Sequence, residues 1–277
     1  MADTSQTVHS PPKPRTYGAV NWLGLWTLYK REVGRFLKVW MQTLLAPVVS
    51  TLLFMTVFKL AFGNRGELSG DFAGLDYNSF LAPGLIVMSM LQNAFQNSSS
   101  SLTIAKVQGS QVDFLMPPLS PLELTIGFIF GAATRGIMVG VIAAVGIHFS
   151  GLADLSVVHI WPVIWFGLMA TIFLAAIGAM GGIWADKFDH LAAVSNFVIV
   201  PLTFLSGTFY DINVLVEPFK SLAFFDPIFF LIDGFRYGFL DAANSDIMTG
   251  ALVSAGVAFA ASAGVWWMLR TGYKLKA

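Results

Sequence analysis

Long apolar segments fill most of this sequence and restrict what it can fold into. Each has about the 20 mostly apolar residues that a helix needs to cross a bilayer. The six segments cover roughly residues 39–62, 80–102, 122–149, 158–184, 191–210 and 249–269. Charged residues make up only 12% of the chain, against roughly 25% in an average soluble domain. The sequence therefore predicts an all-α polytopic membrane protein with six transmembrane helices.

The distribution of Lys and Arg predicts the orientation of these helices, because the cytosolic loops of membrane proteins carry the excess of positive charge. One side holds Lys13, Arg15, Lys30, Arg31, Arg35, Lys38, Lys106, Lys187, Arg270, Lys274 and Lys276. The other side holds only Arg65, Lys220 and Arg236, among many acidic residues. We therefore expect both termini in the cytosol.

The N-terminal part divides into two predicted segments. Residues 1–20 are polar and proline-rich and lack the apolar core of a secretory signal, so we expect a disordered cytosolic tail. Residues 21–38 place apolar side chains at the helical period with Lys and Arg between them. This pattern is typical of a basic amphipathic helix in the membrane interface. A simple membrane anchor fits the same residues equally well.

The cytosolic connection after the second span contains a candidate docking segment. It combines apolar side chains with prolines, which prevent simple continuation of a helix. Its residues are Gln111, Val112, Asp113, Phe114, Leu115, Pro117 and Pro118. A short exposed helix with an apolar face implies a surface against which it docks. The alternative is a hairpin that dips into the lipid head groups.

The segment from Asp211 to Asn244 is too apolar for a free outer loop and too broken by Pro218 and Pro227 to span the membrane. Two short helices that re-enter the outer leaflet fit it best. Such helices are tolerated only where their ends are buried against protein.

The second span ends in a polar stretch, MLQNAFQNSSSSLT (90–103), which is costly in hydrocarbon because its amides and hydroxyls find no water there. On a helix, several of these side chains form one stripe with neighbours beside it. They are Gln92, Asn93, Gln96, Asn97 and Ser99. We expect the stripe to line a water-filled entrance on the cytosolic side. The alternative is hydrogen bonding between helices, worth about 0.6 kcal/mol per bond.

One charge lies deep in a span. Arg135 is about 20 Å along the third helix, near the middle of the bilayer. A charge there costs at least ~2.5 kcal/mol, so protein or water should surround it. Gly127 and Gly131, then Gly136 and Gly140, form two GxxxG patterns that permit close helix approach. Arg135 is either a pathway or gating charge, or a structural charge bonded to carbonyls of a neighbouring helix.

Motifs of enzyme chemistry do not occur in the sequence. It contains no HExxH, no GxSxG, no paired intramembrane carboxylates and no cysteine. The phosphate-binding motif GxxxxGKS/T is also missing, so an ATP-driven process would need another subunit to bind the nucleotide. The sequence predicts no catalytic residue, no metal site, no cofactor in this chain and no nucleic-acid partner.

Several motifs in their order along the chain resemble the membrane subunit of an ABC-2 type transporter. They are FLAPGLIVMS (80–89), ATRG (133–136), PLTFLSGTFY (201–210), the pair Asp226 and Pro227, and IDGFRYGFL (232–240), which contains Asp233 and Arg236. The resemblance covers nearly the whole chain from about Trp22, with residues 39–277 as the transmembrane domain. It is strongest to the YadH-like permeases, with the nodulation-factor export permeases as near relatives.

The resemblance implies a permease without ATPase activity of its own. Such permeases pair as two copies with two ATP-binding subunits, which hold ATP and Mg²⁺, and they export lipids, lipid-linked saccharides or drug-like amphiphiles across the bacterial inner membrane. The docking segment would then couple to the ATPase, and the polar stripe and Arg135 would line the pathway. Asp226, Pro227, Asp233 and Arg236 would belong to the outer re-entrant region. The rivals are a permease that transmits force or a signal and, less favoured, an intramembrane lipid-modifying enzyme.

Overall fold

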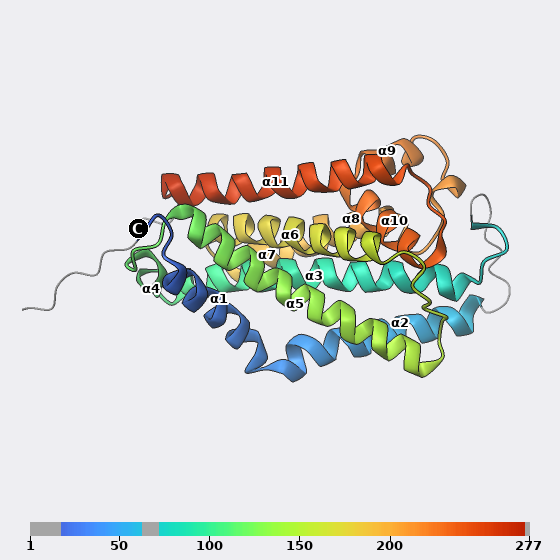
Figure 1. Ribbon diagram of the computed structural model, residues 1–277, viewed down its shortest axis with the longest axis horizontal. Helices are drawn as coiled ribbons and strands as arrows, with labels where there is room; N and C mark the ends of the chain where they lie inside the picture. Colours follow the sequence, from blue (N-terminus) through green and yellow to red (C-terminus); the bar gives the residue numbers. More distant parts are fainter. Residues whose placement is uncertain (1–17, 63–71, 275–277) are drawn as a thin grey trace, which may run out of the picture.

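The computed structural model describes residues 18–62 and 72–274. Figure 1 shows them as a bundle of helices that run mostly along one long axis. Within these two ranges the chain forms helices, turns and connections, with no strand, so the all-α prediction is confirmed. The predicted disordered tail lies outside the described residues, apart from its last three positions.

The long helices are α1 (Trp22–Leu37), α2 (Ala46–Phe62), α3 (Tyr77–Val107), α5 (Pro121–Ser150), α6 (Ile160–Trp184) and α11 (Ile247–Thr271). The shorter helices are α4 (Val112–Leu115), α7 (Phe188–Val194), α8 (Val200–Leu205), α9 (Phe219–Phe225) and α10 (Pro227–Leu240). Two π-helical turns, η1 (Met41–Leu45) and η4 (Ser195–Ile199), precede α2 and α8, and a 3₁₀ turn, η5 (Ile212–Val214), precedes α9.

Five helical segments of the described chain are long and apolar enough to cross a membrane. They are Met41–Ala61, Pro121–Ser150, Ile160–Trp184, Phe188–Leu205 and Ile247–Thr271, and they agree with five of the six predicted spans. The remaining predicted span lies within α3, a helix of 31 residues that carries the polar stretch. Most residues of α3 are buried, so neighbouring helices surround many of its polar side chains.

Small residues allow other helices to contact the backbone of α3. A Cβ added to Gly182 on α6 would lie only 2.7 Å from the backbone oxygen of Ser99. One added to Gly136 on α5 would lie 2.8 Å from the backbone oxygen of Met90. Both distances are too short for real side chains, so these glycines permit the close packing of α5 and α6 on α3.

The other GxxxG pattern of α5 serves a different neighbour. Added Cβ atoms on Gly127 and Gly131 would lie 2.5 Å from Leu28 Cδ2 and 2.6 Å from Glu32 Cβ, both on α1. The two patterns therefore hold α1 and α3 against different parts of α5. The N-terminal helix is thus packed on the bundle along its Leu28 and Glu32 face, while Trp22 and Trp26 are exposed.

The ends of the helices divide into two groups. The start of α1, the short helix α4 and the end of α11 lie together at one end of the bundle, on the left of Figure 1. Helix α9 and the connections from α5 to α6 and from α10 to α11 lie at the opposite end. This grouping places the docking segment at the same end as the start of α1 and the end of α11.

Candidate functional site

A half-open polar cavity of about 260 Å³ lies between α2 and α3. Four of the six predicted pathway residues line it: Gln92, Asn93, Gln96 and Arg135. The segment from η1 to α2 adds the polar residues Gln42, Ser50 and Thr51, and the apolar part of the wall includes Phe54, Leu85 and Met88. The fold therefore brings a polar surface and an apolar surface together around one space. We call this space the polar cavity.

The other two predicted pathway residues lie elsewhere. Asn97 and Ser99 are both buried, and the backbone of Ser99 packs against Gly182 on α6. The predicted stripe is therefore interrupted: its first half faces the polar cavity, and α6 covers the part around Ser99. Angular spacing on a helix fixes which side chains share a face, but the neighbour that covers this face changes along the helix.

Arg135 lies in the wall of the polar cavity and is bonded to neighbouring segments of the chain. Its side chain is 7% exposed and lines the polar cavity. Its Nη2 donates to Asn93 Oδ1 at 2.8 Å, and its Nε donates to the backbone oxygen of Thr43 at 3.4 Å. Neither acceptor is charged, and no carboxylate of the described residues forms an ion pair with Arg135. The guanidinium is thus fixed in place without its charge being neutralised.

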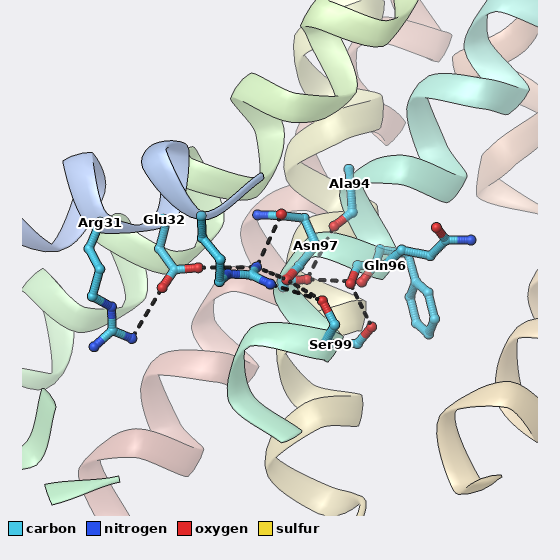
Figure 2. A network of polar contacts seen from close by, with 10 residues as sticks. Arg31, Glu32, Ala94, Gln96, Asn97 and Ser99 are labelled. Carbon is cyan, nitrogen blue, oxygen red and sulfur yellow. Dashed lines mark hydrogen bonds and ion pairs between the residues drawn. The ribbon is translucent and has the colours of Figure 1, made fainter. Parts of the chain in front are cut away.

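Figure 2 shows how α1 is attached to the polar stretch of α3. Arg35 on α1 donates through Nη2 to the backbone oxygen and to Oδ1 of Asn97, at 2.7 and 3.1 Å, and through Nη1 to Ser100 at 3.3 Å. Arg35 also pairs with Glu32 at 3.4 Å, and Glu32 pairs with Arg31 at 3.2 Å. We call this set the α1 latch.

Glu32 is fully buried, and its importance was not predicted from the sequence. A signal was present: Glu32 is the only acidic residue in a strongly basic helix, three positions before Arg35. Charged residues are rarely fully buried unless they are paired. An acidic residue on the apolar side of a basic amphipathic helix therefore indicates an intramolecular pair.

The docking segment, residues 111–118, presents two kinds of apolar side chain. Phe114 is 2% exposed and packs edge-on against Phe128 of α5, with 5.3 Å between the ring centroids. Val112, Leu115 and Met116 are exposed, together with Asp113, Pro117 and Pro118, and Gln111 is half-buried. Phe114 therefore anchors the segment to its own chain, while the remaining apolar side chains are available to a partner.

A second cavity of about 260 Å³ separates the docking segment from α1. Asp113, Phe114, Pro117 and Pro118 line one side, and Leu23, Thr27 and Arg31 are among the residues of the other. The docking segment and α1 therefore form one composite surface at this end of the bundle.

Comparison with known proteins identifies the architecture to which these features belong. The family described as ABC-2 type transporter matches residues 24–240 of this chain. The chain belongs to the ABC-2 type transporter family. Inner membrane transport permease YadH of Escherichia coli strain K12 is 35% identical over 243 residues, which cover 86% of this chain and 92% of YadH. Nodulation protein J of Rhizobium leguminosarum bv. viciae is 26% identical over 225 residues, covering 79% of this chain and 82% of that protein. The predicted family is thus confirmed.

The region around α10, which the sequence predicts to re-enter the outer leaflet, is ordered by buried polar groups. Arg236 is 1% exposed; it donates to the backbone oxygens of Phe80 at 3.2 Å and Gly207 at 2.8 Å, and it lies 3.8 Å from the centroid of the Phe80 ring. It therefore joins α10 to the start of α3 and to the loop after α8.

The acidic residues of the same region accept hydrogen bonds from backbone N–H groups. Asp226 accepts from the backbone N–H of Ile228 at 2.9 Å and caps α10, whose first residue is Pro227. Asp233 accepts from the backbone N–H groups of Asn244 and Ser245 at 3.0 and 2.9 Å. These contacts pair the buried carboxylates of Asp226 and Asp233 with backbone N–H groups, as a helix that re-enters a membrane would need.

Proposed function

We propose that this chain is the membrane-spanning permease subunit of an ATP-driven exporter in the bacterial inner membrane. Two copies would pair with two separate ATP-binding subunits, which supply ATP and Mg²⁺ chemistry. Membership of the ABC-2 type transporter family supports the permease role, and the printed name of the relative YadH supports the inner-membrane location. The chain itself would catalyse no reaction.

The observation that carries the pathway proposal is the polar cavity. It has a wall of amides, hydroxyls and one guanidinium beside a wall of apolar side chains. A bilayer core offers no water to such polar groups, so they are costly there unless water or a polar cargo reaches them. This combination suits amphiphilic cargo, namely a lipid, a lipid-linked saccharide or a drug-like amphiphile, moving outward.

The proposed topology has six spans: the five apolar helical segments and α3, which is the second span along the chain. Both termini lie in the cytosol in this topology. At 1.5 Å per residue, the 31 residues of α3 reach roughly 46 Å, more than the roughly 30 Å of a hydrocarbon core. The start of α1 and the end of α11, which carries Arg270, lie at one end of the bundle, and the proposal assigns this end to the cytosolic side.

Coupling to the ATPase would run through the composite surface of the docking segment and α1. Val112, Leu115 and Met116 supply exposed apolar contact area. Phe114 packs within the same buried cluster as Leu28 of α1, and the α1 latch joins α1 to α3. Movement of a docked ATPase would therefore reach the half of α3 that lies beside the polar cavity.

The proposal is tested by reconstituting the full chain with its ATP-binding subunit in lipid vesicles. We expect ATP-dependent movement of a fluorescent phospholipid or lipid-linked saccharide between the leaflets. The control is an ATP-binding subunit whose phosphate-binding lysine is replaced, which should abolish movement and leave the complex assembled. ATP hydrolysis by an assembled complex without movement of any amphiphile tested would contradict export and favour a role in transmitting force or a signal.

A further inference from the structure

The polar cavity contains hydrogen-bond donors that the protein does not use. The side-chain amides of Gln92, which is half-buried, and Gln96, which is exposed toward the membrane-facing opening of the cavity in the proposed topology, make no hydrogen bond with the described residues. Within the same residues, Arg135 uses Nε and Nη2, and its Nη1 has no acceptor. Amides and guanidinium groups are strong donors, and leaving them unpaired away from bulk water costs free energy. A ligand that accepts several hydrogen bonds would remove that cost.

The charge of the site indicates the sign of this ligand. Arg135 has no carboxylate partner in the described structure, and the nearby carboxylate of Glu32 is already paired with Arg31 and Arg35. A desolvated guanidinium without a counter-ion is strongly unfavourable. An anion bound beside Arg135 would neutralise it. Guanidinium groups match the oxygen geometry of carboxylates and phosphates, which accept two parallel hydrogen bonds from one side chain.

The shape of the cavity indicates how the anion is presented. Its volume of about 260 Å³ is smaller than the roughly 300–1,000 Å³ of pockets that enclose a whole drug-sized ligand. Phe54 and Met88 place an apolar wall beside the polar one, and α2 is mostly exposed along its length. The cavity therefore suits a polar head group whose apolar part extends along α2 into the membrane.

We propose that the polar cavity binds a phosphate group carried by a membrane amphiphile, with Arg135 as the charged donor and Gln92 and Gln96 as neutral donors. This inference rests on the proposed function for its role in transport, because it defines the cargo class of the same site. Binding itself requires neither ATP nor the ATP-binding subunit, so it is measured on the permease alone.

The test uses the purified full chain in an uncharged detergent. It is titrated with phosphatidic acid and with the diacylglycerol of the same acyl chains, and bound lipid is counted by native mass spectrometry. We expect phosphatidic acid to bind at least tenfold more tightly than diacylglycerol, because only the former presents the phosphate. Arg135→Gln should remove this preference, and Arg135→Lys should retain part of it, since a lysine keeps the charge but not the planar fork.

A second variant separates binding from folding. Arg135→Gln also alters the hydrogen bonds to Thr43 and Asn93, whereas Gln92→Leu combined with Gln96→Leu removes side chains that bond no described residue. This double variant should fold normally and bind phosphatidic acid several-fold more weakly. Gln108→Leu is the matched control, because it makes the same chemical change on the exposed C-cap residue of α3, outside the cavity.

The outcomes distinguish the sources of the phosphate and the two proposals. Competition by inorganic phosphate at the affinity of the lipid would assign the site to the free ion and overturn the amphiphile. Equal binding of both lipids, or a double variant that matches Gln108→Leu, would overturn the phosphate site. A chain that binds phosphatidic acid but supports no ATP-dependent movement would refute the exporter while leaving the site intact. Movement of cargo without lipid discrimination would refute only the site.

Discussion

At the scale of single residues, Arg135 lies at the wall of the polar cavity because its two hydrogen-bond acceptors only partly offset the cost of burying its charge. Asn93 and the backbone oxygen of Thr43 accept from it, and such bonds from a charged donor contribute about 1.5–3 kcal/mol each. Burial of an ion costs several kcal/mol, so two neutral acceptors do not remove the whole penalty. The charge therefore belongs at a cavity wall, where water or an anion supplies the remainder.

Replacement of Arg135 by leucine should destabilise the protein. The change leaves the buried Oδ1 of Asn93 without its donor, and an unsatisfied buried acceptor costs about 1–3 kcal/mol. Thermal unfolding in lipid nanodiscs measures the loss, and ATPase stimulation by the partner should fall with it. The control Lys274→Leu removes an exposed pair with Asp186 at 3.1 Å, worth about 0–1 kcal/mol. Equal unfolding temperatures for the two variants would contradict the placement of Arg135.

The glycines of α6 support a second prediction at this scale. Gly182→Ala would place a Cβ 2.7 Å from the backbone oxygen of Ser99, where backbone cannot yield without a helix shift. Overpacking of this kind costs about 1–3 kcal/mol. Gly256→Ala on α11 makes the same change where no atom lies within 4 Å, so its stability should be unchanged or slightly raised. A thermal shift of the same size in both variants would show that close contact between α3 and α6 does not matter.

At the scale of elements, the sequence predicted the positions of the helices better than the contacts between them. Hydropathy identifies the five apolar spans directly. It does not identify α3, whose polar end lowers its mean hydropathy and is tolerated because other helices bury most of it. The span that contains Pro201 is also helical, and the π turn η4 directly before α8 accommodates a residue that lacks an N–H. Proline and polar residues thus modify a span without excluding it.

Contacts within the candidate site were less predictable, because periodicity gives the face of a side chain and not the neighbour that covers it. Ser99 shares a helical face with Gln92 and Gln96 but is covered by α6. Phe114 belongs to an apolar run, and only the packing of Phe128 selects it as the inward residue. No local pattern in the sequence contains this tertiary information.

The docking segment should bind the ATP-binding subunit through its exposed side chains. Leu115→Asp with Met116→Asp places charge on the proposed contact, which is costly to desolvate. We expect loss of co-purification with the ATPase at an unchanged unfolding temperature of the permease. Phe114→Ala, in contrast, removes a buried ring and should cost about 3–5 kcal/mol of stability. Retained co-purification of the double variant would place the contact elsewhere.

The α1 latch should behave as a coupled unit. Arg35→Leu leaves Glu32 buried with only Arg31 as its partner, so it should lower stability by about 1–3 kcal/mol. The double variant with Glu32→Gln should be less destabilised than the sum of the single changes, because it leaves no unpaired buried charge. Unfolding temperatures of the four proteins give this double-mutant cycle, and strict additivity would contradict a direct pair.

At the scale of the whole molecule, α1 and α3 connect the docking segment to the polar cavity. The docking segment packs through Phe114 on α5, α1 packs on the same helix, and the α1 latch then reaches α3 beside the cavity. Under the proposed function, a contact at one end of the bundle would act on a wall of the cavity through these packed helices. This continuity is what a permease driven by a separate ATPase requires.

The last prediction tests this connection in a chain that contains no natural cysteine. Single cysteines at Gln42, Gln92 and Gln96, which line the polar cavity, should react with a membrane-impermeant thiol reagent added from the cytosolic side, because reaction requires a solvated thiolate. Cysteines at Leu91 and Ser99 are buried and serve as protected controls on the same helix. Binding of ATP to the docked partner should lower the reactivity of the three cavity positions, and the variant Arg35→Leu should weaken that response by releasing α1 from α3. Reactivity that is equal at all five positions, or unaffected by ATP in the complete complex, would mean that the cavity is neither hydrated nor coupled to the ATPase.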